Sequence, residues 1–286
     1  MENYILKLKK LKKINVIILL LLSNIALANI DIEDTPIPGG IAVVDFQSNH
    51  SNPKAFYGIV PVYIQHIKDQ YWQALIGIPL LAKVGEKYIT IKDFSTQKIT
   101  FTVHEHHYKE QHIALTGKKK KYVNPSLKHM NRIKRERTIL SKTRKLFSEK
   151  SLFNGQFIRP VKGVITSPFG LKRFYNEQAR RAHTGVDFAG NIGTLIHAPA
   201  DGKVILIGHF FFNGNTIFID HGQGLISVYI HMNKHLVKQG QLVKKGDKIG
   251  TIGQTGRATG AHLHWGIYLN QTTINPNLLF GVSDEI

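Results

Sequence analysis

The chain of 286 residues is long enough for two domains, and with 42% hydrophobic residues it belongs among globular rather than disordered proteins. It contains no cysteine, which excludes disulfide bonds, thiolate metal ligands and a lipid-modified cysteine. The formal net charge of +19 makes nucleic acid a partner to consider, because clustered lysine and arginine bind phosphate.

Residues 1–28 have the three parts of a secretory signal peptide. A basic stretch from Lys7 to Lys13 precedes an apolar run from Val16 to Leu22, and Ala26-Leu27-Ala28 has the small-x-small cleavage pattern. An uncleaved anchor is the alternative, but the apolar stretch is shorter than the roughly 20 residues that a membrane span needs. The sequence therefore predicts a periplasmic or secreted protein with no stable membrane span after cleavage.

Residues 30–117 alternate short β-rich runs with turns, which predicts a small N-terminal β-sandwich domain. The strand candidates are residues 41–46, 58–64, 72–78, 88–91 and 98–103. Four histidines follow them, at His104, His106, His107 and His112. Because no carboxylate recurs with them at ligand spacing, we interpret them as solvated side chains rather than a second metal site.

Residues 118–152 are predicted to form a basic helical linker. Pro125 lies near the expected start of the helix. Apolar side chains recur at helical spacing at Leu127, Met130, Ile133, Leu140 and Phe147. We expect this narrow stripe to pack on a domain while the basic face meets solvent, and a helix lying on a membrane surface is the alternative.

The positive charge is concentrated in this linker. Residues 118–150 hold thirteen lysines and arginines against two glutamates, an excess of eleven in a chain whose net charge is +19. This distribution argues against a nucleic-acid partner and favours attraction to the anionic polymers of a cell envelope.

Residues 153–286 are rich in strands flanked by glycine and lack helical periodicity. The strand candidates are residues 202–207, 215–219, 225–230 and 261–268. They predict an antiparallel sheet with a functional site on one face. Phe210, Phe211 and Phe212 lie beside a turn, where we expect at least one to be core and the others to line a groove.

Three segments of this region combine into a candidate zinc site. They are His183-Thr-Gly-Val-Asp187, Tyr229-Ile-His231 and His262-Leu-His264-Trp265. Alternation along a strand places His262 and His264 on one face. A catalytic zinc takes three protein ligands and keeps one position open, so His183, Asp187 and one histidine of the pair fit that count. The other histidine and His231 remain for proton transfer and charge stabilisation.

Further motifs accompany these segments in a fixed order between about residues 160 and 280. They are Ser167-Pro-Phe-Gly170, Ala198-Pro-Ala-Asp-Gly202, Gly214-Asn-Thr216, Asp220-His-Gly222, Gly246-Asp247 and Gly253-Gln-Thr-Gly256. With them the chain resembles the lysostaphin/LytM-type zinc metallopeptidases, peptidase family M23. Residues 38–44 and 77–80 also resemble the immunoglobulin-like N-terminal domain of some exported members.

The resemblance implies roles that the spacing leaves open. His183, Asp187 and His264 would bind Zn2+, His262 would be the general base, and His231 would stabilise developing charge or shuttle a proton. The implied architecture has an open groove above the sheet of the peptidase domain, residues 153–286. No residue of this set is missing, and no further cofactor is implied.

The implied reaction is cleavage of peptidoglycan cross-link peptides, between D-Ala and diaminopimelate, by metal-activated water. Lys172, Arg173, Arg180 and Arg181 would meet the carboxylates of such a peptide or form ordinary surface charge. Peptidoglycan is the implied partner, with an envelope regulator or adaptor that uncovers the groove as a further expectation. The alternative is a non-enzymatic LytM-type activator of a cell-wall amidase, a class that usually loses zinc ligands.

Overall fold

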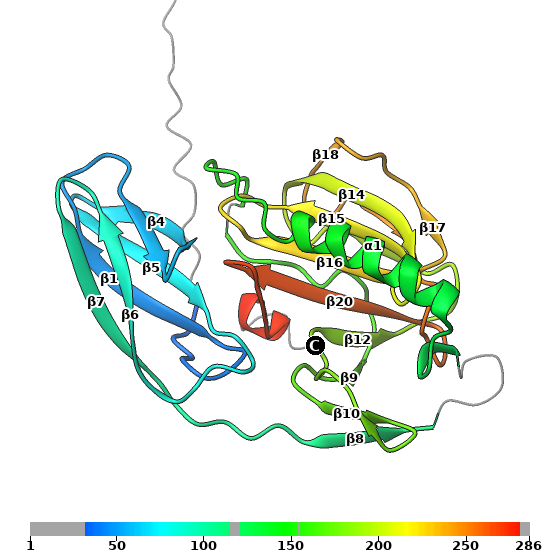
Figure 1. The fold of residues 1–286 in the computed structure, drawn as a ribbon. Coiled ribbons are helices and arrows are strands. Elements are labelled where there is room, and N and C mark those ends of the chain that lie inside the picture. Colours follow the sequence, from blue (N-terminus) through cyan, green and yellow to red (C-terminus); the bar gives the residue numbers. More distant parts are fainter. Residues whose placement is uncertain (1–31, 115–120, 154, 281–286) are drawn as a thin grey trace, which may run out of the picture.

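The computed structural model describes residues 32–114, 121–153 and 155–280 (Figure 1). The expected signal peptide and residues 118–120 of the basic run lie outside the described residues. The described chain is mainly β, as predicted, with α1 (Leu127–Thr143) as its single α-helix. No helix in these ranges is long and apolar enough to cross a membrane.

Two antiparallel sheets form the N-terminal part. The first has the order β1 (Ile41–Gln47), β5 (Tyr71–Gly77), β4 (Tyr63–Lys68), and the second the order β3 (Val60–Pro61), β2 (Lys54–Tyr57), β6 (Gly85–Lys92), β7 (Thr96–Val103). Inward side chains of both sheets, among them Ile76 and Ile89, share one apolar core. The strand expected at residues 58–64 starts later, because Gly58 turns the chain with a φ of 62° and leaves Ile59 exposed, and it is divided into β3 and β4 at Val62.

The connection between the two parts contributes a strand as well as the expected helix. β8 (Glu110–Ile113) runs parallel to β10 (Lys172–Tyr175), which pairs in turn with β11 (Gln178–Ala179). Helix α1 crosses the face of the C-terminal sheet (Figure 1), where Leu140 packs against Phe218 and Val228. The predicted packing on a domain is therefore present. The predicted stripe is only partly right, because Leu127 is 87% exposed and Phe147 follows the helix end.

The C-terminal part is built on one large antiparallel sheet, as predicted. Its order is β18 (Leu242–Val243), β14 (Gly202–Phe210), β15 (Gly214–Asp220), β16 (Ile226–Met232), β20 (His262–Leu269), β12 (Val186–Ala189), β9 (Ile165–Ser167), with β21 (Thr272–Ile274) paired to β20. A smaller sheet has the order β13 (Leu195–His197), β19 (Lys248–Thr251), β17 (Lys234–His235), and a 3-10 helix, η2, spans Pro276–Leu279. Leu263 and Trp265 of β20 are fully buried in the core below the large sheet, so the alternate residues His262 and His264 face the other side.

The N-terminal sheets lie at the end of the large sheet, whereas α1 lies over its face (Figure 1). Two side-chain amides fix this contact: Asn270 pairs with both backbone groups of Gly77, at 2.7 and 3.1 Å, and Gln223 pairs with those of Ile64, at 3.0 and 2.9 Å. A Cβ on Gly77 would come within 2.9 Å of Ile274, so this close approach requires glycine. The geometry therefore leaves the linker, and not the N-terminal sheets, above the histidine face.

Candidate metal centre

Three potential ligands converge where β12 meets β20. Asp187 lies opposite His264 in the register of these strands, and His183 lies in the loop just before β12. His183 Nε2 is 2.9 Å from Asp187 Oδ1, His264 Nδ1 is 2.8 Å from the same oxygen, and the two nitrogens are 2.8 Å apart. All three side chains are buried. The strand pairing thus brings together residues that are 77 to 81 positions apart in the chain.

Neighbouring groups orient two of these three side chains. His183 Nδ1–H donates to the carbonyl oxygen of Pro168 at 2.7 Å, which leaves Nε2 directed at the group. Arg173 donates from Nη2 to Asp187 Oδ2 at 2.8 Å and to Ser167 Oγ at 2.9 Å. The Asp187 carboxylate therefore turns Oδ1 to the histidines and Oδ2 to the arginine.

These contacts fit a bound cation. With Nδ1–H of His183 given to Pro168, the Nε2 of the neutral ring carries a lone pair. That nitrogen and the carboxylate oxygen of Asp187, 2.9 Å apart, would repel each other unless a cation lay between them. Two imidazoles and one carboxylate, without thiolate, are a donor set of catalytic zinc sites. The cofactor is accordingly Zn2+.

Two further histidines lie beside this group, each with one ring nitrogen bonded to a backbone carbonyl. His262 Nδ1–H donates to the carbonyl oxygen of Gly260 at 2.9 Å, so its Nε2 is the atom 3.9 Å from Asp187 Oδ1. His231 Nδ1–H donates to the carbonyl oxygen of Thr255 at 2.8 Å. The rings of His231 and His262 lie 4.9 Å apart between centroids. Both histidines thus keep Nε2 for chemistry above the metal group.

Burial favours the neutral form of the His264 and His231 imidazoles. It is the main cause that lowers the pKa of His264 to about 4, although the nearby Asp187 carboxylate raises it. Burial and the adjacent His262 and His264 together hold the pKa of His231 well below its usual range. His231 also has a φ of 64°, a left-handed conformation that is costly for a non-glycine residue and is common at functional sites.

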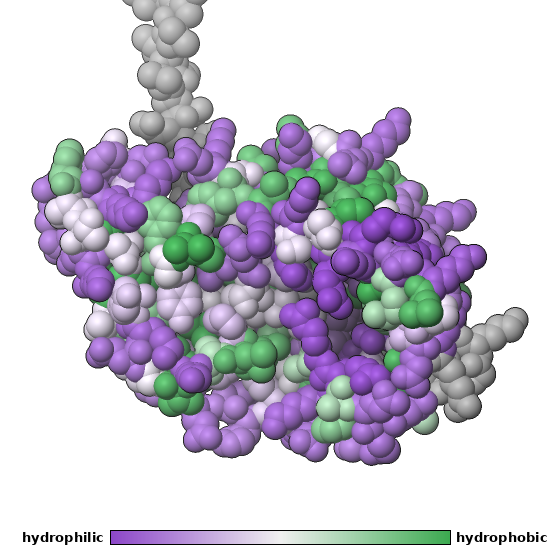
Figure 2. Space-filling view, viewed as in Figure 1, coloured by the Kyte–Doolittle hydropathy of each residue, from purple (hydrophilic) through white to green (hydrophobic). Residues whose placement is uncertain are grey.

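A cavity of about 680 Å³ opens over these residues, between α1 and the face of the sheet. Figure 2 shows a hollow surrounded by hydrophilic side chains in the C-terminal part. Glu136 anchors α1 there, because it accepts a hydrogen bond from the backbone N–H of Phe211 at 2.7 Å, and Arg132 of the same helix donates to its other oxygen from Nε at 2.6 Å. The expected open groove is therefore roofed by the linker helix in this structure.

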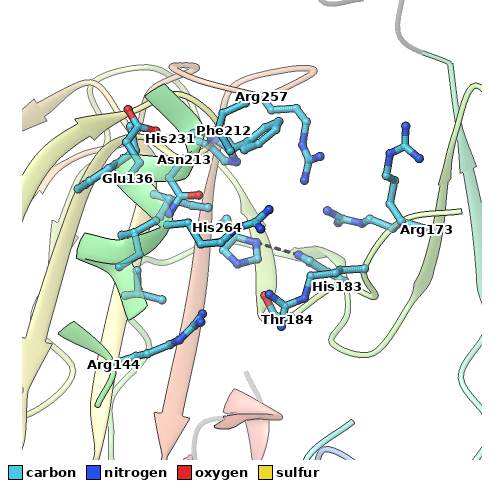
Figure 3. A pocket seen from close by; sticks show the side chains of 18 of the residues that line it. Glu136, Arg144, Arg173, His183, Thr184, Phe212, Asn213, His231, Arg257 and His264 are labelled. Carbon is cyan, nitrogen blue, oxygen red and sulfur yellow. Dashed lines mark hydrogen bonds between the residues drawn. The ribbon is translucent and has the colours of Figure 1, made fainter. Parts of the chain in front are cut away.

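Arginines dominate the charge of this cavity. The arginines that line it are Arg137, Arg144, Arg173, Arg180, Arg181 and Arg257. Figure 3 shows Arg257 and Arg173 at one end and Arg144 at the other. Three of the four cations expected from the sequence line the cavity, whereas Lys172 is exposed and does not. Sequence reasoning missed Arg257, although it directly follows the Gly253–Gly256 motif, and missed Arg137 and Arg144, which sit in a charge run without a motif.

The remaining candidates fall outside the metal group. Phe210 and Phe212 line the cavity, while Phe211 is buried against Tyr122 and His129 of the linker. The four histidines at 104–112 form no three-ligand group among the described residues. His112 instead stacks on Phe174 and contacts Glu177.

Two family models match the chain. Residues 181–276 match "Peptidase family M23", and residues 34–106 match "Peptidase family M23 N-terminal domain". A crystal structure of a Pseudomonas aeruginosa protein assigned to peptidase M23 is similar over nearly its whole length. It is 37% identical, with 87% of this chain and 96% of that chain covered and a TM-score of 0.73.

Curated relatives are similar over the C-terminal part. The peptidoglycan DD-endopeptidase ShyC of Vibrio cholerae is 39% identical over 126 residues, 44% of this chain and 26% of the relative. The DD-carboxypeptidase/endopeptidase Mpg of Neisseria meningitidis serogroup B is 38% identical over 133 residues, 46% of this chain and 30% of the relative. The chain thus spans about a quarter to a third of the length of these relatives.

Proposed function

The chain belongs to peptidase family M23, and from this premise we propose that it is a zinc metalloendopeptidase that cleaves peptidoglycan cross-link peptides at the bond between D-Ala and diaminopimelate. Relatives named as peptidoglycan DD-endopeptidases support the substrate class. The observation that carries the proposal is the convergence of His183, Asp187 and His264 under His231 and His262. A metal group with two free imidazole nitrogens above it suits amide hydrolysis.

Each residue of the site has one task in the proposed mechanism. His183 Nε2, Asp187 Oδ1 and His264 Nδ1 would hold the zinc, which when bound supplies Lewis acidity for a carbonyl and for water. His262 would accept a proton at Nε2 while Nδ1–H stays bonded to the Gly260 carbonyl. His231, whose Nδ1–H is given to the Thr255 carbonyl, would take up a proton at Nε2 during the reaction and would pass it on, or hold it against the negative charge that develops at the scissile carbonyl.

The surroundings of His231 favour the neutral form of its ring before the reaction begins. The buried position that lowers the pKa of His231 keeps its imidazole neutral at pH 7. In acid, protons compete with the metal for His183 and His264, so zinc affinity and turnover fall together.

We place the reaction outside the cytoplasm, in the periplasm or at the cell wall. The signal-like residues 1–28, the basic linker and the cell-wall substrate of the named relatives support this location. The proposed domains are residues 30–117, 118–152 and 153–286, and the two family matches lie inside the first and the last. Mass analysis of the exported protein tests the leader, because cleavage after Ala28 predicts an N-terminus at Asn29.

An envelope regulator or adaptor would act on the roof of the cavity. The hydrogen bond from the Phe211 backbone N–H to Glu136 ties helix α1 to the β14–β15 hairpin, so a partner that displaced α1 would open the groove to a cross-linked polymer. Glu136→Ala removes that anchor and should raise the rate of digestion of isolated sacculi. An unchanged or lower rate would show that α1 is a permanent wall of the groove.

The function is tested by zinc content and product analysis on the full chain. We expect about one zinc per chain and release of monomers from cross-linked muropeptides, resolved by mass spectrometry and stopped by a chelator. Monomers that persist after chelation would contradict the zinc mechanism. A zinc-loaded protein that releases nothing, yet stimulates a purified cell-wall amidase, would support the activator alternative.

A further inference from the structure

The cavity over the metal group has more cations than its surroundings neutralise. Glu136 lines the same cavity, but its two oxygens are taken by Arg132 and by the backbone N–H of Phe211. Asp187 is taken by Arg173 through Oδ2 and by the histidines through Oδ1. The carboxylates at the cavity are thus already engaged, and other arginines there have no anionic partner within residues 32–114, 121–153 and 155–280.

Arg257 is one of the cavity arginines that no carboxylate among the described residues neutralises, and two aromatic rings hold it in place. Its guanidinium carbon lies over the rings of Tyr175 and Phe212, at 4.8 and 5.0 Å from their centroids. Among the described residues no carboxylate forms an ion pair with it, and its side chain donates no hydrogen bond to them. The two rings cover the face of the guanidinium and leave its N–H edge for a ligand.

A backbone hydrogen bond fixes the position of Arg257. Its backbone N–H donates to the carbonyl oxygen of Phe212 at 2.8 Å, which joins the loop after Gly256 to the β14–β15 hairpin. Burial is the main cause that lowers the pKa of Arg257, and the positive charges of Arg173 and Arg180 lower it further. Holding a half-buried cation beside two others costs free energy that an anion would recover.

Arg180 stands beside Arg257 with its orientation already set. Its Nη1 donates to the carbonyl oxygen of Ala179 at 3.0 Å and its Nη2 to that of Val123 at 3.2 Å. Neutral acceptors hold the side chain in place but leave its charge uncompensated. Arg173 completes the trio, yet it is committed to Asp187.

We propose that Arg257, with Arg180 beside it, forms a carboxylate-binding subsite that fixes one end of the peptide in the groove. This inference rests on the proposed peptidase function, because it takes the ligand to be the peptide substrate. A planar guanidinium edge matches a carboxylate with two parallel hydrogen bonds. Apolar side chains of the same cavity, among them Val228 and Ile230, suit the aliphatic atoms of a short peptide.

The carboxylate has two possible sources, the C-terminus of the peptide or a side chain, and three probes distinguish them. They are acetyl-D-Ala-D-Ala, its C-terminal amide, and acetyl-D-Glu-D-Ala amide. Calorimetry on the zinc-loaded full chain should show about 10- to 100-fold tighter binding of one acidic probe than of the neutral amide. Mass spectrometry confirms that the probes stay intact during the measurement.

Arg257→Gln should abolish this preference while zinc content and binding of the neutral amide stay unchanged. Arg257→Lys, which keeps the charge but loses the planar edge, should retain part of the preference. Arg135→Gln is the matched control, because it removes an exposed charge of α1 that does not line the cavity. Equal binding of all three probes by the unmodified chain, or a preference that survives in Arg257→Gln, overturns the subsite.

The outcomes separate the subsite from the proposed reaction. A carboxylate preference that depends on Arg257, in a protein that releases nothing from muropeptides, supports the subsite and contradicts the peptidase function. Cleavage of muropeptides by a protein that shows no carboxylate preference supports the peptidase function and contradicts the subsite.

Discussion

Two histidines of the C-terminal part, His264 in β20 and His221 just after β15, are both buried but have different partners. Burial lowers the pKa of each to about 4. His221 uses both ring nitrogens within the fold, with Nδ1 2.7 Å from the carbonyl oxygen of Asp201 and Nε2 2.8 Å from Ser227 Oγ. His264 Nδ1 instead meets His183 Nε2 and Asp187 Oδ1, two atoms that carry lone pairs.

The difference teaches that burial and a lowered pKa do not identify a functional histidine. What distinguishes the two is whether the partners already satisfy the ring. A ring satisfied by a carbonyl and a hydroxyl stabilises the fold, whereas a ring among other electron-rich donors needs a cation. His221 is fully buried and belongs to the first kind.

The largest expected effect is at His264. His264→Ala removes one of three ligands, so zinc content should fall from about one per chain to near zero and turnover should be lost. Elemental analysis of the purified variant, with circular dichroism to confirm folding, measures this. A variant that kept its zinc would show that His264 is not a metal ligand and does not differ from His221 in that respect.

His231→Ala should separate metal binding from chemistry. Its ring contributes no atom to the three-ligand group, so zinc content should stay near one per chain. Turnover on muropeptides should fall about 100- to 10,000-fold, the range of a lost acid–base or charge-stabilising group. Full turnover in this variant would remove His231 from the mechanism.

Arg173→Gln tests the support of Asp187. Without the hydrogen bond to Oδ2, the carboxylate loses its fixed orientation, and zinc affinity should fall about 10- to 100-fold. Competition with a chelator of known affinity measures the change. The comparison is with Arg135→Gln, in which zinc affinity should equal that of the unmodified chain.

His221→Ala should leave zinc content and activity per folded molecule unchanged but destabilise the fold. It opens a cavity and leaves a buried partner unsatisfied, a cost of roughly 2 to 4 kcal/mol in free energy of unfolding. Urea unfolding of the metal-free protein measures it. Loss of zinc from the folded variant would show that His221 supports metal binding as well as the fold.

The contribution of His221 to the free energy of unfolding should decrease as the pH falls. The pKa of His221 is about 4 in the folded chain and about 6.5 unfolded, so the unfolded state binds the proton first as pH falls. The stabilisation is complete above about pH 6.5 and is lost toward pH 4, by up to about 3 kcal/mol. The stability difference between the unmodified chain and His221→Ala should therefore shrink over that interval.

Much of the fold was readable from local pattern. The C-terminal strands follow alternating runs between glycine turns, and β14, β15, β16 and β20 appear within about three residues of their predicted ends. The short strand β8 carried no signal, because its pairing partner β10 lies some 60 residues later. The exposure of Leu127 was also unreadable, since helical spacing does not say how far along a helix a neighbouring sheet extends.

The sequence by itself determined which residues could make the site. Strand alternation put His262 and His264 on one face, and the ligand types selected His183 and Asp187 as their companions. Only the tertiary structure decided what surrounds them. It set Arg173 on Asp187, laid α1 across the groove and placed Arg257 against Phe212, because each of these contacts joins segments whose spacing no local period encodes.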